Sequence, residues 1–239
     1  MYNLIKQIYD GIPQLVSNTY YGYKILAAYL AYGSSYDFCK FYSCGDGIIH
    51  IYYSSMVIDG NIDVDELEMF INMMKPLNVE VSSKIALHNV RGLTKKHRTL
   101  FALKSGESDI KFNDVKVNAF TEKCYTILNE SFENMGSFDM WYVDISHRIR
   151  HQVANLYLFD NTTITQQFNI NGYVFLSHIA TAKTKRGKGN ARRLLYCLAD
   201  KYRSAGCEAY LWALDHRKSY YESIGFEPVA EDILYEMEG

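Results

Sequence analysis

A short glycine-bearing segment between a predicted strand and a predicted helix restricts the possible folds of this chain more than any other feature. It reads Arg186-Gly187-Lys188-Gly189-Asn190-Ala191. Residues 173–181 before it form a β-prone run, and apolar residues after it recur at helical spacing. Such a turn lets backbone N–H groups approach an anion, and the positive end of the helix favours negative charge there. The segment predicts a phosphate-binding loop, to which Arg186 and Lys188 contribute charge-assisted hydrogen bonds.

The residues of this loop exclude two common nucleotide-binding motifs. The lysine and hydroxyl that close a Walker A loop are missing, and so are the three spaced glycines of a dinucleotide fingerprint. The residues fit Arg/Gln-x-x-Gly-x-Gly/Ala instead. Further along, a predicted strand at 208–214 leads to Tyr221-Glu222-Ser223-Ile224-Gly225-Phe226. The helix between them is predicted to bury one face: Ala191, Leu194, Leu195, Leu198, Ala199 and Tyr202.

These two motifs, in this order, resemble the signature of the GNAT N-acetyltransferases. In that family an acetyl-CoA pyrophosphate loop is followed by Tyr-Glu-x-x-Gly-Phe, and Ile179-Ala180-Thr181 is similar to the end of the strand before the loop. The resemblance covers residues 138–226 well and the rest loosely. It implies an α/β protein with a mixed sheet, in which a C-terminal GNAT acyl-CoA N-acyltransferase fold follows a smaller GNAT-like half-domain, as in bacterial members with an extra N-terminal lobe.

The resemblance also implies roles for individual residues. Acetyl-CoA, the co-substrate, would lie where the strand 173–181 diverges from its neighbour. The amine acceptor would attack the thioester directly, so that no covalent enzyme intermediate forms. Tyr221 would be the general acid that protonates the departing thiolate. The expected acetyl-CoA contacts are Ile179, Thr181, Arg186, Gly187, Lys188, Gly189, Asn190 and Ala191.

The sequence leaves the general base open. The strand position that often carries glutamate in the family corresponds to Phe175 here. Asp144, His147 and His178 are the candidates on the substrate side, acting directly or through water. Residues 141–151 have two interpretations, an amphipathic helix with a charged face or a wall of the acceptor pocket in which Asp144 pairs with a substrate ammonium. Their close Asp, Ser and His spacing does not indicate a hydrolase triad, because triads are assembled across a fold.

The remaining sequence predicts two lobes, 1–105 and 106–239, divided near the polar stretch 104–109. The first lobe is expected to begin with a helix broken near Gly11-Ile12-Pro13. Its basic run Lys95-Lys96-His97-Arg98 is interpreted as a solvated face. The other expected elements are a hairpin of 36–44 and 48–58, a helix at 63–75, a strand at 79–82, helices at 120–132 and 138–150, and a hairpin of 154–159 and 162–170.

Composition and charge restrict the partners. The 239 residues are 48% hydrophobic and 22% charged, as in ordinary globular domains. A net charge of −2 gives no general attraction to nucleic acid or anionic membranes. The five cysteines match no common metal or disulfide pattern, and no stretch resembles a secretion signal or a membrane span. We therefore expect a cytoplasmic monomer or homodimer without metal, nucleic acid or membrane partners.

Two functions stay open at this point. The first is transfer of an acetyl group from acetyl-CoA to a primary amine of a small molecule or peptide. The second is a non-catalytic module that binds or senses acyl-CoA, with the N-terminal lobe as its partner-binding surface. The intact loop and Tyr221 favour the enzyme. Since no second Arg/Gln-x-x-Gly-x-Gly/Ala pattern precedes residue 186, we expect one active site per chain.

Overall fold

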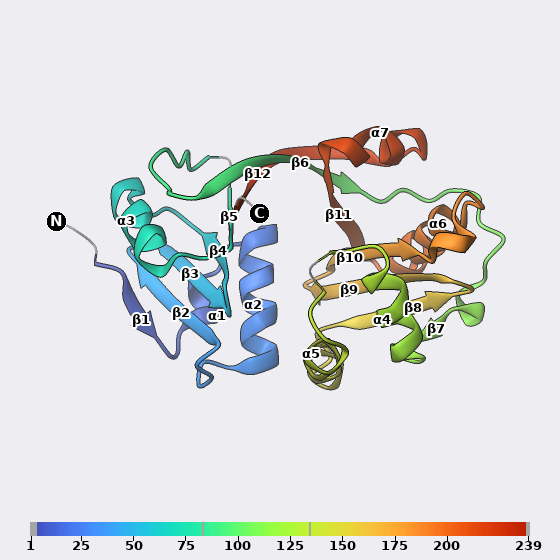
Figure 1. Ribbon diagram of the computed structural model, residues 1–239, viewed down its shortest axis with the longest axis horizontal. Coiled ribbons are helices and arrows are strands. Elements are labelled where there is room, and N and C mark those ends of the chain that lie inside the picture. Colours follow the sequence, from blue (N-terminus) through green and yellow to red (C-terminus); the bar gives the residue numbers. More distant parts are fainter. Residues whose placement is uncertain (1–3, 83, 134, 238–239) are drawn as a thin grey trace. The chain divides into compact units, whose positions relative to one another are not determined.

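The computed structural model describes residues 4–82, 84–133 and 135–237 (Figure 1). The chain forms two compact units. Unit 1 comprises Met1–Arg98 with Glu231–Gly239, and unit 2 comprises Thr99–Ala230. These units are defined by packing, and the division into folding domains at residue 105 stays a prediction.

Unit 1 contains a three-stranded antiparallel meander, followed by a helix and a strand parallel to the last strand of the meander. Its strand order is β1-β2-β3-β4-β5-β12. The expected hairpin is confirmed, but its second run forms two strands because the chain turns at Tyr53, where φ is 51°. The elements are β1 (Lys6–Ile8), α1 (Ile12–Leu15), α2 (Tyr20–Tyr32), β2 (Cys39–Cys44), β3 (Gly47–Tyr52), β4 (Ser55–Asp59), α3 (Val64–Met74) and β5 (Asn78–Val81).

Unit 2 repeats this topology, with strand order β6-β11-β10-β9-β8-β7. Its meander β8-β9-β10 is followed by α6 and by β11, which lies parallel to β10. The elements are β6 (Leu93–Ala102), η1 (Phe112–Asp114), β7 (Lys116–Val117), α4 (Thr121–Asn129), α5 (Phe138–Arg150), β8 (Asn155–Phe159), β9 (Thr162–Ile170), β10 (Tyr173–Thr181), η2 (Lys183–Lys185), α6 (Asn190–Ser204), β11 (Glu208–Leu214), α7 (Asp215–Ser223) and β12 (Glu227–Met237).

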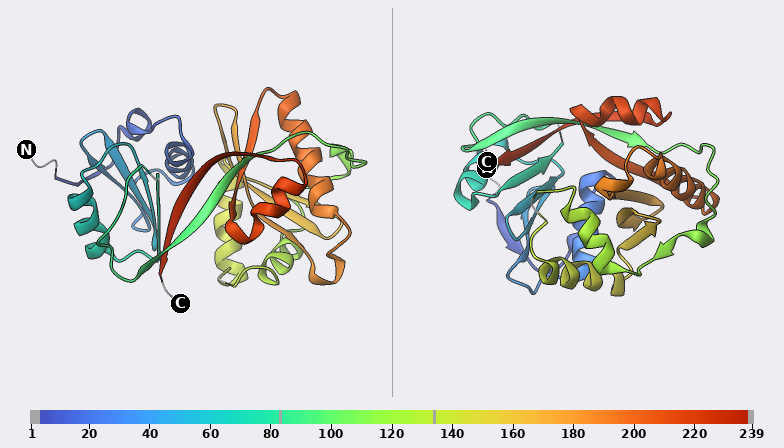
Figure 2. Two further views of the ribbon diagram at one scale, coloured as in Figure 1. Left: turned by 90° about the horizontal axis from the view of Figure 1, so that it is seen from above. Right: turned by 45° about the vertical axis from the view of Figure 1, so that its right-hand side comes forward.

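The parallel pairs β4–β5 of unit 1 and β10–β11 of unit 2 are each in register over three residues. Residues 55–57 lie opposite 78–80 in unit 1, and residues 173–175 lie opposite 208–210 in unit 2. The two long strands β6 and β12 run side by side and contribute to both units (Figure 2). Unit 1 is therefore the GNAT-like half-domain expected from the sequence.

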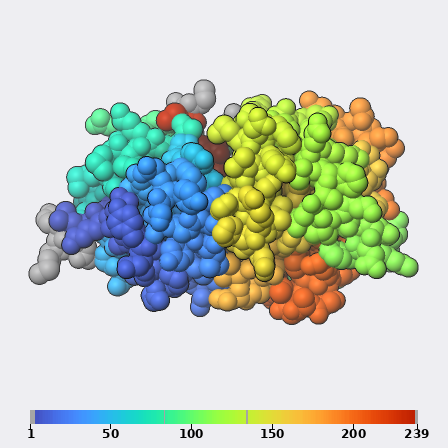
Figure 3. Space-filling view, turned by 90° about the horizontal axis from the view of Figure 1, so that it is seen from below, coloured from blue at the N-terminus to red at the C-terminus, as the bar shows by residue number. Residues whose placement is uncertain are grey.

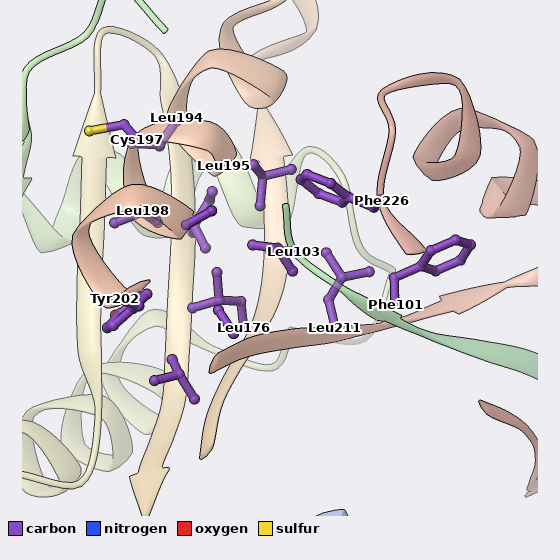
Figure 4. Close-up of a cluster of buried hydrophobic side chains, with 14 of the residues drawn as sticks. Phe101, Leu103, Leu176, Leu194, Leu195, Cys197, Leu198, Tyr202, Leu211 and Phe226 are labelled. Carbon is purple, nitrogen blue, oxygen red and sulfur yellow. The ribbon is translucent and has the colours of Figure 1, made fainter. Parts of the chain in front are cut away.

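The core of unit 2 lies between its sheet and α6 (Figure 4). The predicted face of α6 is buried at every position except Ala191, which is half-buried. The opposite face of the sheet packs against α4, because Leu156 and Leu158 of β8 join the cluster of Cys124, Ile127 and Leu128. Tyr157, between those two leucines, points to the α6 side. The sheet of unit 2 is thus covered by α6 on one face and by α4 on the other.

Two predictions for the first lobe were wrong. Lys6–Ile8, before Gly11, form the strand β1 rather than a helix, and they pair with β2. Arg98, predicted on a solvated face, is 5% exposed, whereas the other three residues of that basic run are exposed. Its Nη1 donates a hydrogen bond to Glu80 Oε2 at 2.9 Å, and Lys24 forms an ion pair with the same carboxylate. A buried guanidinium is tolerated here because its carboxylate partner is buried beside it.

Candidate functional site

The parallel strands β10 and β11 pair over only the first part of their length. β10 runs to Thr181 and β11 to Leu214, yet among the described residues their register ends at Phe175 and Tyr210. β10 stays paired with β9, on its other side, as far as Thr181. Backbone groups on the β11 side of β10, beyond Phe175, therefore lie outside the β10–β11 ladder. Ile179 and Thr181, expected to bind the pantetheine amides, both belong to this stretch.

A β-bulge distorts β10 beside this opening. The register against β9 shifts between Ser177 and Ala180, and His178 lies in the left-handed region with φ 46°. Bulges re-aim side chains and are frequent next to active sites. The half-buried ring of His178 lies with Nδ1 3.3 Å from Ser177 Oγ and edge-on to Phe132, at a centroid distance of 5.6 Å. His178 is therefore held in a strained backbone conformation at the edge of the opening, rather than within a regular strand.

Two glycines in the loop after β10 adopt left-handed backbone conformations. Gly187 and Gly189 have φ of 78° and 74°, and Gly189 is the N-cap of α6. A Cβ on Gly187 would meet nothing within 4 Å, and one on Gly189 would meet only Arg192 Nη2, at 3.9 Å. The glycines are needed for the conformation, and the space in front of them is open. The first N–H groups of an α-helix have no partner within the helix, so those of α6 are available for hydrogen bonds at this end.

The polar side chains of the loop hold it in place. Arg186 Nε donates to the Thr181 carbonyl at 3.0 Å, and Arg186 Nη2 donates to Ser131 Oγ at 2.9 Å. Asn190 is buried, and its Nδ2 donates to Asp160 Oδ2 at 3.0 Å. Two of the predicted cofactor ligands thus make contacts within the protein. Lys188 is exposed, so the groups directed outward are this lysine and the backbone amides.

Tyr221 lies on α7, which directly follows β11. It is 8% exposed, and its ring lies 5.6 Å from that of Phe101 and 6.2 Å from that of Phe226. Its cluster includes Leu195 of α6, which Figure 4 shows close to Phe226. Burial raises the pKa of Tyr221 to about 12. The phenol therefore keeps its proton at neutral pH, as a general acid must.

The candidates on α5 lie on a surface helix (Figure 3). α4 and α5 contact each other, and α4 covers the face of the sheet opposite α6. Asp144 Oδ1 accepts a hydrogen bond from Arg148 Nε at 3.1 Å, and the ring of His147 lies 4.4 Å from that of His151. Of the α5 residues only Ile145 is buried, which supports the interpretation as an amphipathic helix. Asp144 would have to leave Arg148 before it could pair with a substrate ammonium.

Unit 1 provides an internal comparison, because α3 stands where α6 stands in unit 2. The α3 N-cap is Asp63, whose carboxylate accepts hydrogen bonds from the N–H groups of Asp65 and Glu66, both at 3.1 Å. Those two residues add further negative charge to the first turn. The helix start that corresponds to the glycine loop of unit 2 is therefore occupied by carboxylates in unit 1.

In the described part of the chain, no group of three or more His, Cys, Asp or Glu side chains is placed to hold a metal ion. No helix in that part combines the length and apolar character needed to cross a membrane.

Two carboxylates that support the loop could not be recognised from the sequence. Asp109 and Asp160 lie outside the motif and contact Arg193 and Asn190 of α6. The only sequence signal was the polar character of 104–109, which we interpreted as a boundary. Contacts between such distant positions leave no local pattern.

No protein-family model and no curated protein matches the sequence. The fold does match solved structures. A GCN5-related N-acetyltransferase from Sphaerobacter thermophilus is 12% identical, with a TM-score of 0.58, over 97% of this chain and 94% of that one. A GNAT-family acetyltransferase from Colwellia psychrerythraea is 15% identical, with a TM-score of 0.54, over 98% and 99%. A GCN5-related N-acetyltransferase from Kribbella flavida is 15% identical, with a TM-score of 0.53, over 81% and 87%. The chain therefore has the fold of the GNAT acetyltransferases.

Proposed function

We propose that this chain is an acetyl-CoA-dependent N-acetyltransferase that acts on a primary amine of a small molecule or peptide. The observation that carries the proposal is the opening between β10 and β11, which lies next to a glycine loop at the start of α6. An elongated ligand with amides at one end and phosphates at the other suits both features, because the strand offers backbone groups and the loop offers N–H donors.

In this proposal the protein supplies positioning and proton transfer. Bound acetyl-CoA provides an acyl carbon activated by its thioester. Backbone amides at 187–191, with Lys188, hold the diphosphate. The amine forms the new C–N bond as the C–S bond breaks, and Tyr221 gives its proton to the departing sulfur. The phenolate is then reprotonated from water.

The amine must also lose a proton, and we assign its removal to His178. This residue lies on the bulge beside the opening, whereas Phe175 offers no carboxylate and Asp144 is paired with Arg148. The ring of Phe175 instead stacks on Phe168, with centroids 5.5 Å apart. His147 is placed second because it lies on α5, against His151.

The second candidate function is a module that binds acyl-CoA without turnover. The observation that favours it is Phe175, a buried aromatic ring at the strand position where the family often has glutamate. We further propose that unit 1 binds no CoA in either case, because carboxylates occupy the start of α3.

A thiol-release assay with acetyl-CoA and a panel of primary amines separates the two functions. The enzyme releases free CoA in proportion to one or more amines, at a rate above that without acceptor. Calorimetric binding of acetyl-CoA without release by any amine would favour the binding module. Absence of both would overturn the assignment of the site.

A further inference from the structure

The polar segment 104–109 is fastened along α6. Arg193 and Asp109 form a bidentate ion pair. Arg193 Nε donates to Asp109 Oδ1 and Arg193 Nη2 donates to Asp109 Oδ2, both at 2.6 Å. Ser108 Oγ donates to the carbonyl of Arg193 at 2.9 Å. Gly106 lies against Tyr196, since a Cβ at that glycine would stand 2.5 Å from the ring. This segment therefore runs along the first two turns of α6.

The same contacts extend to the first residue of α6. Arg193 Nη1 donates to Asn190 Oδ1 at 3.1 Å, and the side-chain Nδ2 of Asn190 donates to Asp160 Oδ2 at 3.0 Å. Asn190 directly follows Gly189 of the phosphate loop. Two carboxylates from different segments, Asp109 and Asp160, thus fix the first turn of α6 through Arg193 and Asn190.

Arg192 and Arg193 have different surroundings. The Nε, Nη1 and Nη2 atoms of Arg193 all make hydrogen bonds within the protein, and Asp109 neutralises its charge. Arg192 lies on the loop side, with Nη2 3.9 Å from the position of a Cβ on Gly189. Arg192 is placed to attract an anion, whereas Arg193 can act on an anion only through the geometry of the helix.

One turn further along, α6 is joined to α7. Tyr196 OH donates to the carbonyl of Ile224, the C-cap residue of α7, at 2.6 Å. Tyr221 lies three residues earlier on α7. The contacts of α6 therefore connect the segment 104–109, the phosphate loop and the helix that carries the proposed general acid.

We propose that Arg193 and Asp109 are positioning residues for acyl-CoA binding. Their pair sets the orientation of the first turn of α6, and so of the N–H groups that would bind the diphosphate, without contacting the ligand. This inference rests on the proposed function.

The decisive variant is Asp109→Asn, measured by calorimetry with acetyl-CoA. If Arg193 acted as an electrostatic ligand, removing the Asp109 charge would release its guanidinium and tighten binding. If Arg193 and Asp109 instead position the first turn of α6, the same substitution should weaken acetyl-CoA binding. We expect Kd to rise about threefold to tenfold in Asp109→Asn and also in Arg193→Lys, because an ammonium cannot form the two parallel hydrogen bonds of a guanidinium.

Two further measurements separate positioning from lost stability. Hydrogen exchange at residues 187–192 should be faster in both variants, with an unfolding midpoint within about 2 °C of the unaltered chain, because exposed ion pairs contribute little to stability. The exchanged pair Asp109→Arg with Arg193→Asp should recover part of the affinity. Arg203→Lys, an exposed arginine in the last turn of the same helix, serves as the control and should leave Kd unchanged.

The outcomes are distinguishable. If the unaltered chain binds acetyl-CoA and Asp109→Asn binds it equally well or more tightly, positioning is wrong while the proposed function stands. If the unaltered chain does not bind acetyl-CoA, the proposed function fails and this inference fails with it.

Discussion

Replacing Tyr221 by phenylalanine tests the proposed chemistry most directly. The change removes one hydroxyl and keeps the ring. The ring is 8% exposed and packs between Phe101 and Phe226, so its position is set by contacts that phenylalanine preserves. We expect the structure around α7 to persist, with a loss of less than about 1.5 kcal/mol in unfolding free energy.

The expected effect on turnover is much larger. A positioned proton donor contributes about 10²–10⁴-fold to rate, which corresponds to about 3–5 kcal/mol of activation free energy. Burial raises the pKa of Tyr221 from 10.0 to about 12, so the donor is fully protonated below pH 10. Its loss should therefore lower kcat by a similar factor at every pH from 6 to 9, where no titration of Tyr221 takes place.

The assay is steady-state CoA release at saturating acetyl-CoA, together with calorimetric Kd. In Tyr221→Phe we expect kcat to fall about 10²–10⁴-fold and Kd for acetyl-CoA to change less than about threefold. Tyr220→Phe is the matched control, because Tyr220 is 39% exposed and adjacent helical side chains point about 100° apart.

Two results would refute the reasoning. Near-normal turnover in Tyr221→Phe, with a small loss of stability, would mean that the tyrosine only packs. A defect in Tyr220→Phe with normal turnover in Tyr221→Phe would mean that the motif had been aligned one residue out of register.

Three other substitutions test separate features of the protein. Gly189→Glu should abolish acetyl-CoA binding in calorimetry, whereas Gly189→Ala, which adds the strain of a side chain at φ 74° without the charge, should retain measurable affinity. His178→Gln should lower kcat about 10²–10⁴-fold with little change in Kd for acetyl-CoA, and near-normal turnover would exclude His178 as the base. Arg98→Leu should lower the unfolding free energy in urea by about 3 kcal/mol, since it leaves a buried carboxylate without its guanidinium, while the exposed His97→Leu should change it little. Burial alone would raise the pKa of Glu80, but Lys24 and Arg98 hold it well below 4.5. The stability that ionised Glu80 contributes is therefore present above pH 4.5 and is lost on acidification. In Arg98→Leu the unfolding free energy should depend less on acid pH.

The sequence by itself determined the helices, strands and turns whose conformation depends on neighbouring residues in the chain. β10 and β11 have the predicted bounds, and the face of α6 follows from helical periodicity. The glycines at 187 and 189 could be recognised because a left-handed backbone strongly favours that residue type. The prediction of a phosphate-binding loop has the same basis, since the binding groups it proposes lie in the backbone of six consecutive residues.

The tertiary structure decided everything that depends on distant partners. Arg98 appeared to belong to a solvated run because its partner Glu80 lies on another strand, and burial of a charge depends on that partner. The bulge at His178 depends on pairing with β9. Asp109 looked like linker because Arg193, which it holds, lies 84 residues away. Spacing along one chain reports local conformation, whereas pairing between segments is fixed only when packing brings them together, and both the opening beside β10 and the support of its loop are of that second kind.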